Sequence, residues 1–348
     1  MPRYYTRACN FYYGIKSKLL VKEKKALPLN GNDQISFDKV EIITRKSTKT
    51  ILIKKINNLP HQIKKNIKRD IELITKSKKN FKKLRFQKIP NIMGILNITP
   101  DSFSDGGKYN RDDLAKKQLN FLFKSGADLV DIGGESTRPG SKSVSSGLEW
   151  KRIENILKIK KKEMISLDTR KSDIMEKGIN LGVQLINDVS GLTFDKKSVN
   201  ILKKYKTPFV LHHSLGNPDI MQISPKYKNV LLDIYDFFEE KIKSLRKVGI
   251  NHNNIILDPG IGFGKNLKHN ITIIKNISIY HSLGLPILLG ISRKKFIKEL
   301  SDVNDSSLRI GGTVSSSIFA MMQGVQVLRV HDVNEIKQSI KVFKELIN

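Results

Sequence analysis

The chain has 348 residues, of which 39% are hydrophobic, so it can build one large core or two modest ones. Its single cysteine, Cys9, excludes an intrachain disulfide and a cysteine-based zinc site, and no run of about 18 apolar residues could span a membrane. No apolar segment follows the early basic residues as it does in secretory signals. We therefore expect a cytoplasmic protein, with a mitochondrial transit peptide as the alternative.

The formal net charge of +30 is concentrated near the N-terminus. Residues 1–90 hold 24 Lys and Arg against 6 Asp and Glu, so about a quarter of the chain carries more than half of the excess. Such an excess could indicate nucleic-acid binding. Because lysine, isoleucine and asparagine are abundant along the whole chain, a compositional bias of the genome is the simpler explanation, and we do not expect nucleic acid as a partner.

A boundary near residue 90 separates a basic N-terminal extension, residues 1–90, from the remainder, residues 91–348. In the extension, β-branched runs at residues 40–43 and 50–53 flank a polar stretch, which predicts a β-hairpin. Isoleucines then recur at helical spacing over residues 63–74, which predicts one amphipathic helix. We expect either a small accessory unit that docks on the remainder or across a dimer interface, or a partly ordered arm.

From residue 91 onward, eight short apolar runs alternate with helical stretches, which predicts parallel strands joined by crossover helices. Eight such units match the usual size of a TIM barrel, about 250 residues, so we predict an α/β protein with a (β/α)8 TIM barrel. A doubly wound sheet is the alternative, but it would normally offer one switch-point site. The predicted strands are residues 92–96, 129–132, 164–167, 184–186, 209–211, 255–257, 287–289 and 327–330. The predicted helices are residues 114–123, 150–159, 174–181, 230–248, 271–280 and 314–322.

Polar side chains follow these strands, at the barrel end where TIM-barrel active sites lie. Asp168 follows the third strand, Asn187 the fourth and Asp258 the sixth. Their carboxylate and amide groups suit a flat heterocycle that is held edge-on. Taken alone, either aspartate could simply cap the helix that follows it.

A cationic group of side chains is predicted at the same end. Positive charge near the rim suits a phosphate or diphosphate. Asn97 adds a neutral oxygen that could join an Mg2+ ion bridging phosphate oxygens. A basic run alone is more often solvated surface, but polar groups after all eight strands are harder to explain in that way. The cationic group comprises Arg138, Lys294, Arg329 and His331.

These segments resemble the dihydropteroate synthases. The resemblance covers roughly residues 91–340, follows the family's order and leaves the extension outside. Its longest motifs are MGILNITPDSFSDGG at residues 93–107, GESTRPG at residues 134–140 and LDPGIGFGK at residues 257–265. The shorter matching segments are residues 167–169, 186–189, 292–294 and 329–331.

The resemblance implies a transferase of folate biosynthesis and a sulfonamide target. It would join 6-hydroxymethyl-7,8-dihydropterin diphosphate to 4-aminobenzoate and release 7,8-dihydropteroate and diphosphate. The family also implies Mg2+ and a homodimer. By position, the implied pterin contacts are Asp168, Asn187, Asp258 and Lys294. The implied diphosphate contacts are Asn97, Arg329 and His331, with Asn97 on Mg2+. The implied aminobenzoate pocket lies between the loops carrying Phe103, Thr137, Arg138 and Pro139, and Phe263.

The implied chemistry is electrostatic. When diphosphate leaves, positive charge develops on the pterin methylene, so an ionised Asp168 or Asp258 would stabilise it. The groups expected to act on the reacting atoms are Asp168, Lys294, Arg329 and His331. The neutral aromatic amine is already a nucleophile, so we expect neither a strong base nor a covalent enzyme intermediate.

Two places depart from the family pattern. His212, His213 and Ser214 stand where members often have methionines around one histidine, and Lys295 stands where a small hydroxyl residue is common. Both bear on substrate affinity and sulfonamide sensitivity. Two other functions stay open: a pterin-binding methyltransferase domain that serves a corrinoid, which needs no diphosphate cluster, and a non-catalytic pterin- or nucleic-acid-binding protein.

Overall fold

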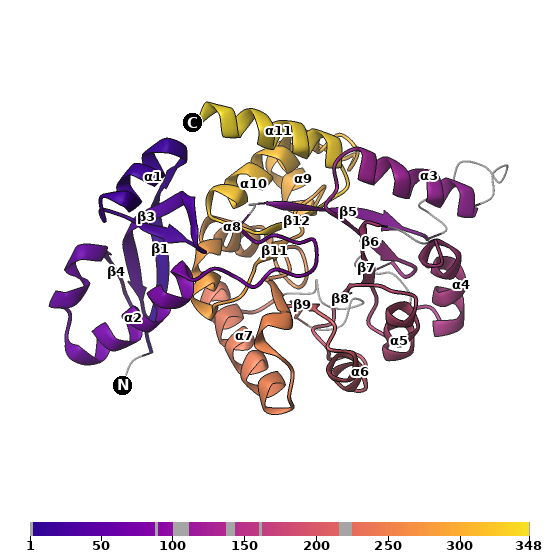
Figure 1. The fold of residues 1–348 in the computed structure, drawn as a ribbon, viewed down its shortest axis with the longest axis horizontal. Helices are drawn as coiled ribbons and strands as arrows, with labels where there is room; N and C mark the ends of the chain where they lie inside the picture. The colour runs from indigo at the N-terminus through magenta and orange to yellow at the C-terminus, as the bar shows by residue number, and fades with distance from the viewer. Residues whose placement is uncertain are drawn as a thin grey trace.

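A barrel of parallel strands and a smaller antiparallel sheet lie side by side in the molecule (Figure 1). The computed structural model describes residues 3–87, 90–99, 111–136, 143–159, 162–215 and 225–347. Within this part of the chain, no helix is both long enough and apolar enough to cross a membrane.

Eight parallel strands form the barrel within the described residues, in the order β10-β9-β8-β7-β6-β5-β12-β11. A parallel bridge between Leu257 and Ile287 joins the two ends of this order, so the barrel is nearly closed. Each predicted strand is confirmed to within about two residues at its ends. The strands are β5 (Asn91–Asn97), β6 (Leu129–Gly133), β7 (Met164–Asp168), β8 (Leu185–Asp188), β9 (Phe209–His212), β10 (Ile255–Asp258), β11 (Leu288–Leu289) and β12 (Val327–Val330).

Helices surround the barrel, and the predicted ones are confirmed with one exception. Residues 271–280 do not form one helix, because Asn276 leaves the helical conformation and a 3-10 segment follows. Three further helices, α6, α9 and α11, were not predicted. The helices are α3 (Arg111–Lys124), α4 (Ser146–Leu157), α5 (Ser172–Asn180), α6 (Ser198–Tyr205), α7 (Val230–Lys247), α8 (Leu267–Lys275), α9 (Lys295–Ser301), α10 (Ile310–Met322) and α11 (Val333–Leu346), with 3-10 segments η3 (His252–Asn254) and η4 (Ile277–Leu283).

Side chains inside the barrel lie in layers, because every second residue of a strand points inward. The layer at the N-terminal end of the strands is entirely apolar, and each strand contributes one residue. Phe81, Leu84 and Phe86, from the segment before β5, cover this layer and close that end of the barrel. The layer consists of Met93, Leu129, Met164, Leu185, Val210, Ile256, Leu288 and Val327.

The N-terminal extension is an ordered unit and not a loose arm. Its antiparallel sheet has β3 at the centre, β1 on one side, and β2 and β4 along the other side. The predicted hairpin is β3 with β4, and the predicted amphipathic helix is α2. The elements are β1 (Tyr5–Tyr13), α1 (Gly14–Lys22), β2 (Leu27–Leu29), β3 (Asn32–Ile43), β4 (Thr48–Leu52), η1 (Ile53–Asn58) and α2 (His61–Thr75).

The extension packs on the barrel of its own chain, beside α7, η4 and the end of α10 (Figure 1). The ring of Tyr5 is buried edge-on against Tyr235, with 5.2 Å between centroids. Ser278 donates a hydrogen bond to the carbonyl of Ala8 at 2.9 Å, and the hydroxyl of Tyr13 donates to the carbonyl of Met322 at 2.9 Å. Of the two docking arrangements that we considered, the structure therefore shows the one on the barrel.

Replacing Phe86 with alanine tests whether the extension completes the barrel core. Phe86 is fully buried against the apolar layer, so Phe86→Ala should lower the free energy of unfolding by about 3–5 kcal/mol. Chemical denaturation measures this loss. Leu19→Ala, at an exposed position of α1, is the control and should change it by no more than about 0.5 kcal/mol. Equal, small effects of the two substitutions would contradict the inference that Phe86 belongs to the barrel core.

Candidate functional site

A cavity of about 700 Å³ lies at the C-terminal ends of the barrel strands, where the sequence predicts the site. Its wall brings together the predicted residues Asn97, Phe263, Lys294, Arg329 and His331. These come from β5, the segments after β10 and β11, and β12 with the residue that follows it. Residues far apart in the chain thus meet at one end of the barrel.

Strand register aligns part of the predicted set. Asn97 pairs with Gly133, Gly133 with Asp168, and Asp168 with Asn187, so these residues form one row across β5 to β8. Gly133 keeps this row open, because a Cβ there would already touch Asp168 and the Oδ1 of Asn97, at 3.4 and 3.5 Å. A larger residue would fill the space between the amide and the carboxylate.

A charged network joins this row to the layer beneath it. Arg329 donates through Nε to Asp131 at 2.7 Å and through Nη2 to Asp168 at 2.9 Å. Asn187 donates through Nδ2 to the same oxygen of Asp131 at 2.8 Å. We expected Arg329 near the rim as a diphosphate contact. The structure instead places it between two buried carboxylates, while its side chain still borders the cavity.

Asp131 is the residue of this network to which the sequence analysis gave no role. It is fully buried in β6, between apolar neighbours. An available signal was its position, because a carboxylate inside an apolar strand requires a partner. Leu129, Asp131 and Gly133 point into the barrel together by the alternation of a strand, just as Val327, Arg329 and His331 do. The inward carboxylate and the inward guanidinium therefore meet in the same layer.

The two predicted aspartates differ in electrostatics. Burial raises the pKa of Asp168 to about 8, although the charge of Arg329 opposes this shift. Burial raises the pKa of Asp258 to about 6, and the shift is opposed by the backbone N–H of Gly260 at 2.8 Å and by the charges of Lys294 and Arg329. At neutral pH, Asp258 is therefore the aspartate that is more fully ionised.

Lys294 and Phe263 form one wall of the cavity. The Nζ of Lys294 lies 4.1 Å from the centroid of the Phe263 ring, which is a cation–π contact. Burial lowers the pKa of Lys294 to about 8, although the charge of Asp258 opposes this shift. Gly262 has a φ of +81°, and a Cβ there would stand 3.3 Å from Cδ of the lysine. Glycine thus satisfies the turn and leaves room for the lysine.

His331 differs from the positive charge that we expected. Burial and the neighbouring Arg293 and Arg329 lower its pKa to about 3, so the ring is neutral at physiological pH. The Oγ of Ser292 accepts the backbone N–H of His331 at 3.2 Å and lies 3.0 Å from its Nδ1. In the tautomer whose Nδ1 accepts from this hydroxyl, the imidazole proton lies on Nε2. In that tautomer His331 offers a neutral N–H donor at the cavity.

Two histidines, His212 at the end of β9 and His213 directly after it, lie near Phe263 and Lys265. The ring of His212 packs edge-on against Phe263 at 4.5 Å between centroids. The Nδ1 of His213 lies 3.0 Å from the Nζ of Lys265, which also donates to the carbonyl of Phe263 at 2.9 Å. Burial lowers the pKa of both histidines well below the usual value and that of Lys265 to about 7. These side chains support the wall, and Lys295 stands exposed at the mouth, paired with Glu299.

The predicted residues Phe103, Thr137, Arg138 and Pro139 lie outside the described residues. Glu135, just before three of them, belongs to a buried ion cluster that the sequence analysis missed. Its carboxylate accepts from Arg170 at 3.1 Å, from Lys171 at 3.0 Å and from the backbone N–H of Val144 at 3.0 Å. Burial opposes ionisation, yet these donors lower the pKa of Glu135 to about 2.

The described residues contain no cluster of three or more His, Cys, Asp or Glu side chains that could hold a metal ion. The Asn97 amide is a neutral oxygen ligand on the cavity wall. Mg2+ often takes few protein ligands and keeps waters and phosphate oxygens. The donor set of the described residues therefore fits an Mg2+ ion that arrives with a diphosphate.

Comparison with known proteins agrees with this geometry. The sequence model of the pterin-binding enzyme family matches residues 93–331. Dihydropteroate synthase of Escherichia coli (strain K12) is 37% identical over 262 residues, which cover 74% of this chain and 92% of that protein. Dihydropteroate synthase of Neisseria meningitidis serogroup C is 41% identical over 267 residues, which cover 74% and 93%.

Solved structures show the same relationship. Yersinia pestis dihydropteroate synthase, in complex with a sulfonamide drug, matches with a TM-score of 0.70 and 39% identity over 74% of this chain and 94% of that chain. Xanthomonas albilineans dihydropteroate synthase with 4-aminobenzoic acid matches with a TM-score of 0.71 and 33% identity over 76% and 94%. A match of this extent, over the barrel and its cavity, shows that the chain belongs to the dihydropteroate synthase family.

Proposed function

We propose that the chain is a transferase that joins 6-hydroxymethyl-7,8-dihydropterin diphosphate to 4-aminobenzoate and releases 7,8-dihydropteroate and diphosphate. The observation that carries this proposal is the network of Arg329 with Asp131 and Asp168 at one end of the barrel, beside Lys294 and His331. It combines acceptors for a heterocycle with donors for an anion. The solved Xanthomonas albilineans enzyme binds 4-aminobenzoic acid in one structure and 7,8-dihydropteroate in another.

In this proposal the pterin enters the deep part of the cavity. Asp168, Asn187 and Asp258 are buried and do not themselves line the described cavity wall; they would offer acceptors and an amide to a ring edge that reaches past the wall. Lys294 offers a donor from the wall itself. The carboxylates are buried, so a substrate N–H group that reaches them replaces no strong contact with water. This environment favours a flat donor-rich ring over a solvated ion.

Departure of the diphosphate is the step that the charges assist. The C–O bond to the pterin methylene breaks with its electron pair going to diphosphate, and positive charge spreads into the ring. An ionised Asp258 stabilises that charge. The Nε2–H of His331 and the further N–H donors of Arg329 stabilise the leaving group. The amine lone pair of 4-aminobenzoate then forms the new C–N bond, and the amine loses a proton.

Asn97 is the residue that we propose to contact Mg2+. The ion would neutralise charge on the diphosphate when bound. Phe263, together with Thr137 and Arg138, is proposed to form the aminobenzoate pocket, since Phe263 lies on the cavity wall.

The two alternative functions receive less support. A corrinoid-linked methyltransferase needs no diphosphate donors, yet Lys294, Arg329 and His331 all border the cavity. A non-catalytic binding protein would not need to keep the complete set of charged groups. The relatives reported above are named dihydropteroate synthases. The cytoplasmic location stays a prediction.

Removing the guanidinium tests the central network. Arg329→Ala should reduce kcat/KM by roughly a hundredfold or more, because it takes donors from the leaving group and leaves Asp131 and Asp168 buried without their cation. Steady-state formation of dihydropteroate with Mg2+ measures the loss. Arg246→Ala, on the exposed end of α7, is the matched control. A folded wild type that binds the pterin diphosphate but forms no product would contradict the proposed reaction.

The pH profile tests the charge states. Asp258 must be ionised, so kcat/KM should rise as pH increases through about 6. Lys294 must be protonated, so kcat/KM should fall as pH increases through about 8. Asp258→Asn should remove the acidic limb along with most activity. Lys294→Arg should move the alkaline limb upward, because a guanidinium stays charged there. If the acidic limb of the profile persists in Asp258→Asn, a group other than Asp258 causes that limb.

A homodimer is the proposed assembly. Large apolar side chains are exposed on and between the neighbouring helices α9, α10 and α11, and exposed apolar surface of this kind supports an interface there. These side chains are Leu300, Leu308, Phe319 and Val342. Light scattering on the purified protein should give twice the chain mass of 39.6 kDa, and Phe319→Glu should shift it toward the monomer. A wild-type monomer at micromolar concentration would refute the dimer.

A further inference from the structure

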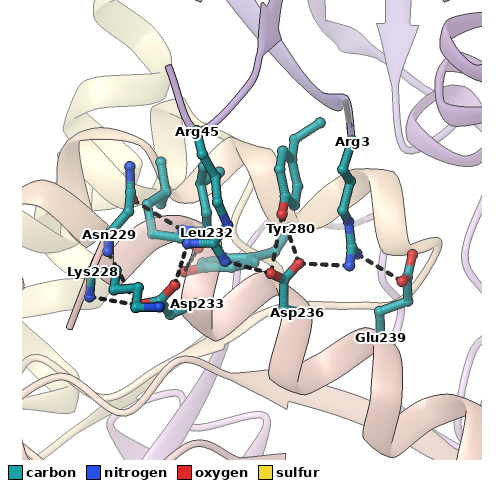
Figure 2. A network of polar contacts seen from close by, with 11 residues as sticks. Arg3, Arg45, Lys228, Asn229, Leu232, Asp233, Asp236, Glu239 and Tyr280 are labelled. Atoms are coloured by element: carbon teal, nitrogen blue, oxygen red, sulfur yellow. Dashed lines mark hydrogen bonds and ion pairs between the residues drawn. The ribbon is translucent and has the colours of Figure 1, made fainter. Parts of the chain in front are cut away.

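A polar network ties the extension to α7, at some distance in the chain from the catalytic motifs (Figure 2). Arg45 donates through Nη1 to Asp233 at 2.7 Å and through Nη2 to Asp236 at 2.6 Å. Arg3 pairs with Asp236 at 2.9 Å and with Glu239 at 2.7 Å. The basic extension thus meets an acidic face of α7, whose carboxylates lie three residues apart.

Asp233 has two separate tasks, one for each carboxylate oxygen. Its Oδ1 accepts from Arg45, and its Oδ2 accepts the backbone N–H groups of Lys228 at 2.9 Å and Asn229 at 3.1 Å. Asn229 is the N-cap of α7, and its side chain accepts from the backbone N–H of Leu232. The same carboxylate therefore connects the extension to the residues that lead into α7.

The segment before α7 reaches the cavity wall. Pro225 borders the cavity, and the hydroxyl of Tyr227 donates to the carbonyl of Gly264 at 3.0 Å. Gly264 lies between Phe263 and Lys265, which both border the cavity. The ring of Tyr227 also packs edge-on against His269 at 5.0 Å. A shift of residues 227–229 would thus be transmitted to the wall that carries Phe263.

Arg45 itself is held in place by its turn. It lies in the connection between β3 and β4, where the backbone N–H of Thr44 donates to the carbonyl of Ser47 at 2.8 Å. The hydroxyl oxygen of Thr44 accepts the backbone N–H groups of Lys46 at 3.1 Å and Ser47 at 2.9 Å. Hydrogen bonds therefore order the turn on both sides of Arg45, and the guanidinium of Arg45 reaches α7 from an ordered backbone.

We propose that Arg45 is a positioning residue for the aminobenzoate side of the cavity, acting through Asp233, the start of α7, Tyr227 and Gly264. The substrate named here rests on the proposed function, whereas the chain of contacts does not. Without Arg45, Asp233 would lose its cation, whereas Asp236 would keep Arg3 and the hydroxyl of Tyr5. Asp233 would then carry an unpaired charge at helical spacing from Asp236, and like charges at this spacing repel. Asp233 would then hold residues 228 and 229 less firmly.

Arg3 supplies the matched control. It binds the same helix through Asp236 and Glu239, farther from the N-terminus of α7, and makes no contact with Asp233 among the described residues. Arg3→Gln and Arg45→Gln each remove one arginine that docks the extension. Only Arg45→Gln removes the contact that leads to the cavity.

The test compares Arg45→Gln, Arg45→Lys and Arg3→Gln in the full-length protein. For Arg45→Gln, KM for 4-aminobenzoate should rise roughly two- to fivefold, as befits one half-exposed ion-pair network, with kcat changed by less than about twofold. Arg45→Lys should fall between the wild type and Arg45→Gln, because an ammonium cannot bridge both carboxylates as a fork. Arg3→Gln should leave KM unchanged.

Amide hydrogen exchange gives a second readout that does not depend on turnover. Arg45→Gln should speed exchange at Lys228 and Asn229, and Arg3→Gln should not. Equal KM changes in the two variants would overturn the proposal, because docking in general would then be responsible. Unchanged exchange in Arg45→Gln would also overturn it. If neither the wild type nor any variant forms dihydropteroate, the proposed function is wrong. The hydrogen-exchange comparison then still shows whether Arg45 orders residues 228 and 229.

Discussion

The guanidinium of Arg329 is the charge on which the site depends. It stands inside a barrel whose other end is wholly apolar, and it is bonded to Asp131 and Asp168 at 2.7 and 2.9 Å. Two carboxylates in such a place would otherwise repel each other and lose their contact with water. The cation makes their burial tolerable, and Asn187 donates a second hydrogen bond to the Oδ2 of Asp131, whose Oδ1 has no hydrogen-bond partner among the described residues. The proposed pterin face and the proposed diphosphate face of the cavity are therefore two sides of one network.

The same network explains why charge states in the cavity are mixed. Burial alone would neutralise every titratable group there, and each group keeps its charge only to the extent that a partner opposes burial. Asp258 has a backbone N–H and three basic side chains nearby, so its pKa is about 6, whereas Asp168 reaches about 8. His331 has cations as neighbours and stays neutral. The neighbours that the fold brings to each side chain, and not its residue type alone, set its protonation state.

Much of this was predictable from the sequence, and the exceptions have physical reasons. The alternation of apolar runs with helical stretches predicted the barrel. The polar residues at the strand ends predicted the positions of Asn97, Lys294 and His331, because the period of a strand decides which side chains point inward. The depth of Arg329 was not predictable, since a long side chain reaches a layer that its Cα does not occupy. Asp131 was missed because its partner lies 198 residues away in the chain. β1 was missed because Tyr5–Tyr13 lacks a β-branched run.

The covering of the apolar barrel end by Phe81, Leu84 and Phe86 separates two kinds of boundary. The family match begins at residue 93, after all three side chains. The stretch that the family model matches is therefore shorter than the stretch that buries the interior of the barrel. A fragment cut at the family limit would open onto a ring of eight apolar side chains, the kind of exposed surface that drives self-association. In this chain, the segment that carries Phe81, Leu84 and Phe86 covers one end of the barrel, and we expect the smallest fragment that folds on its own to include it.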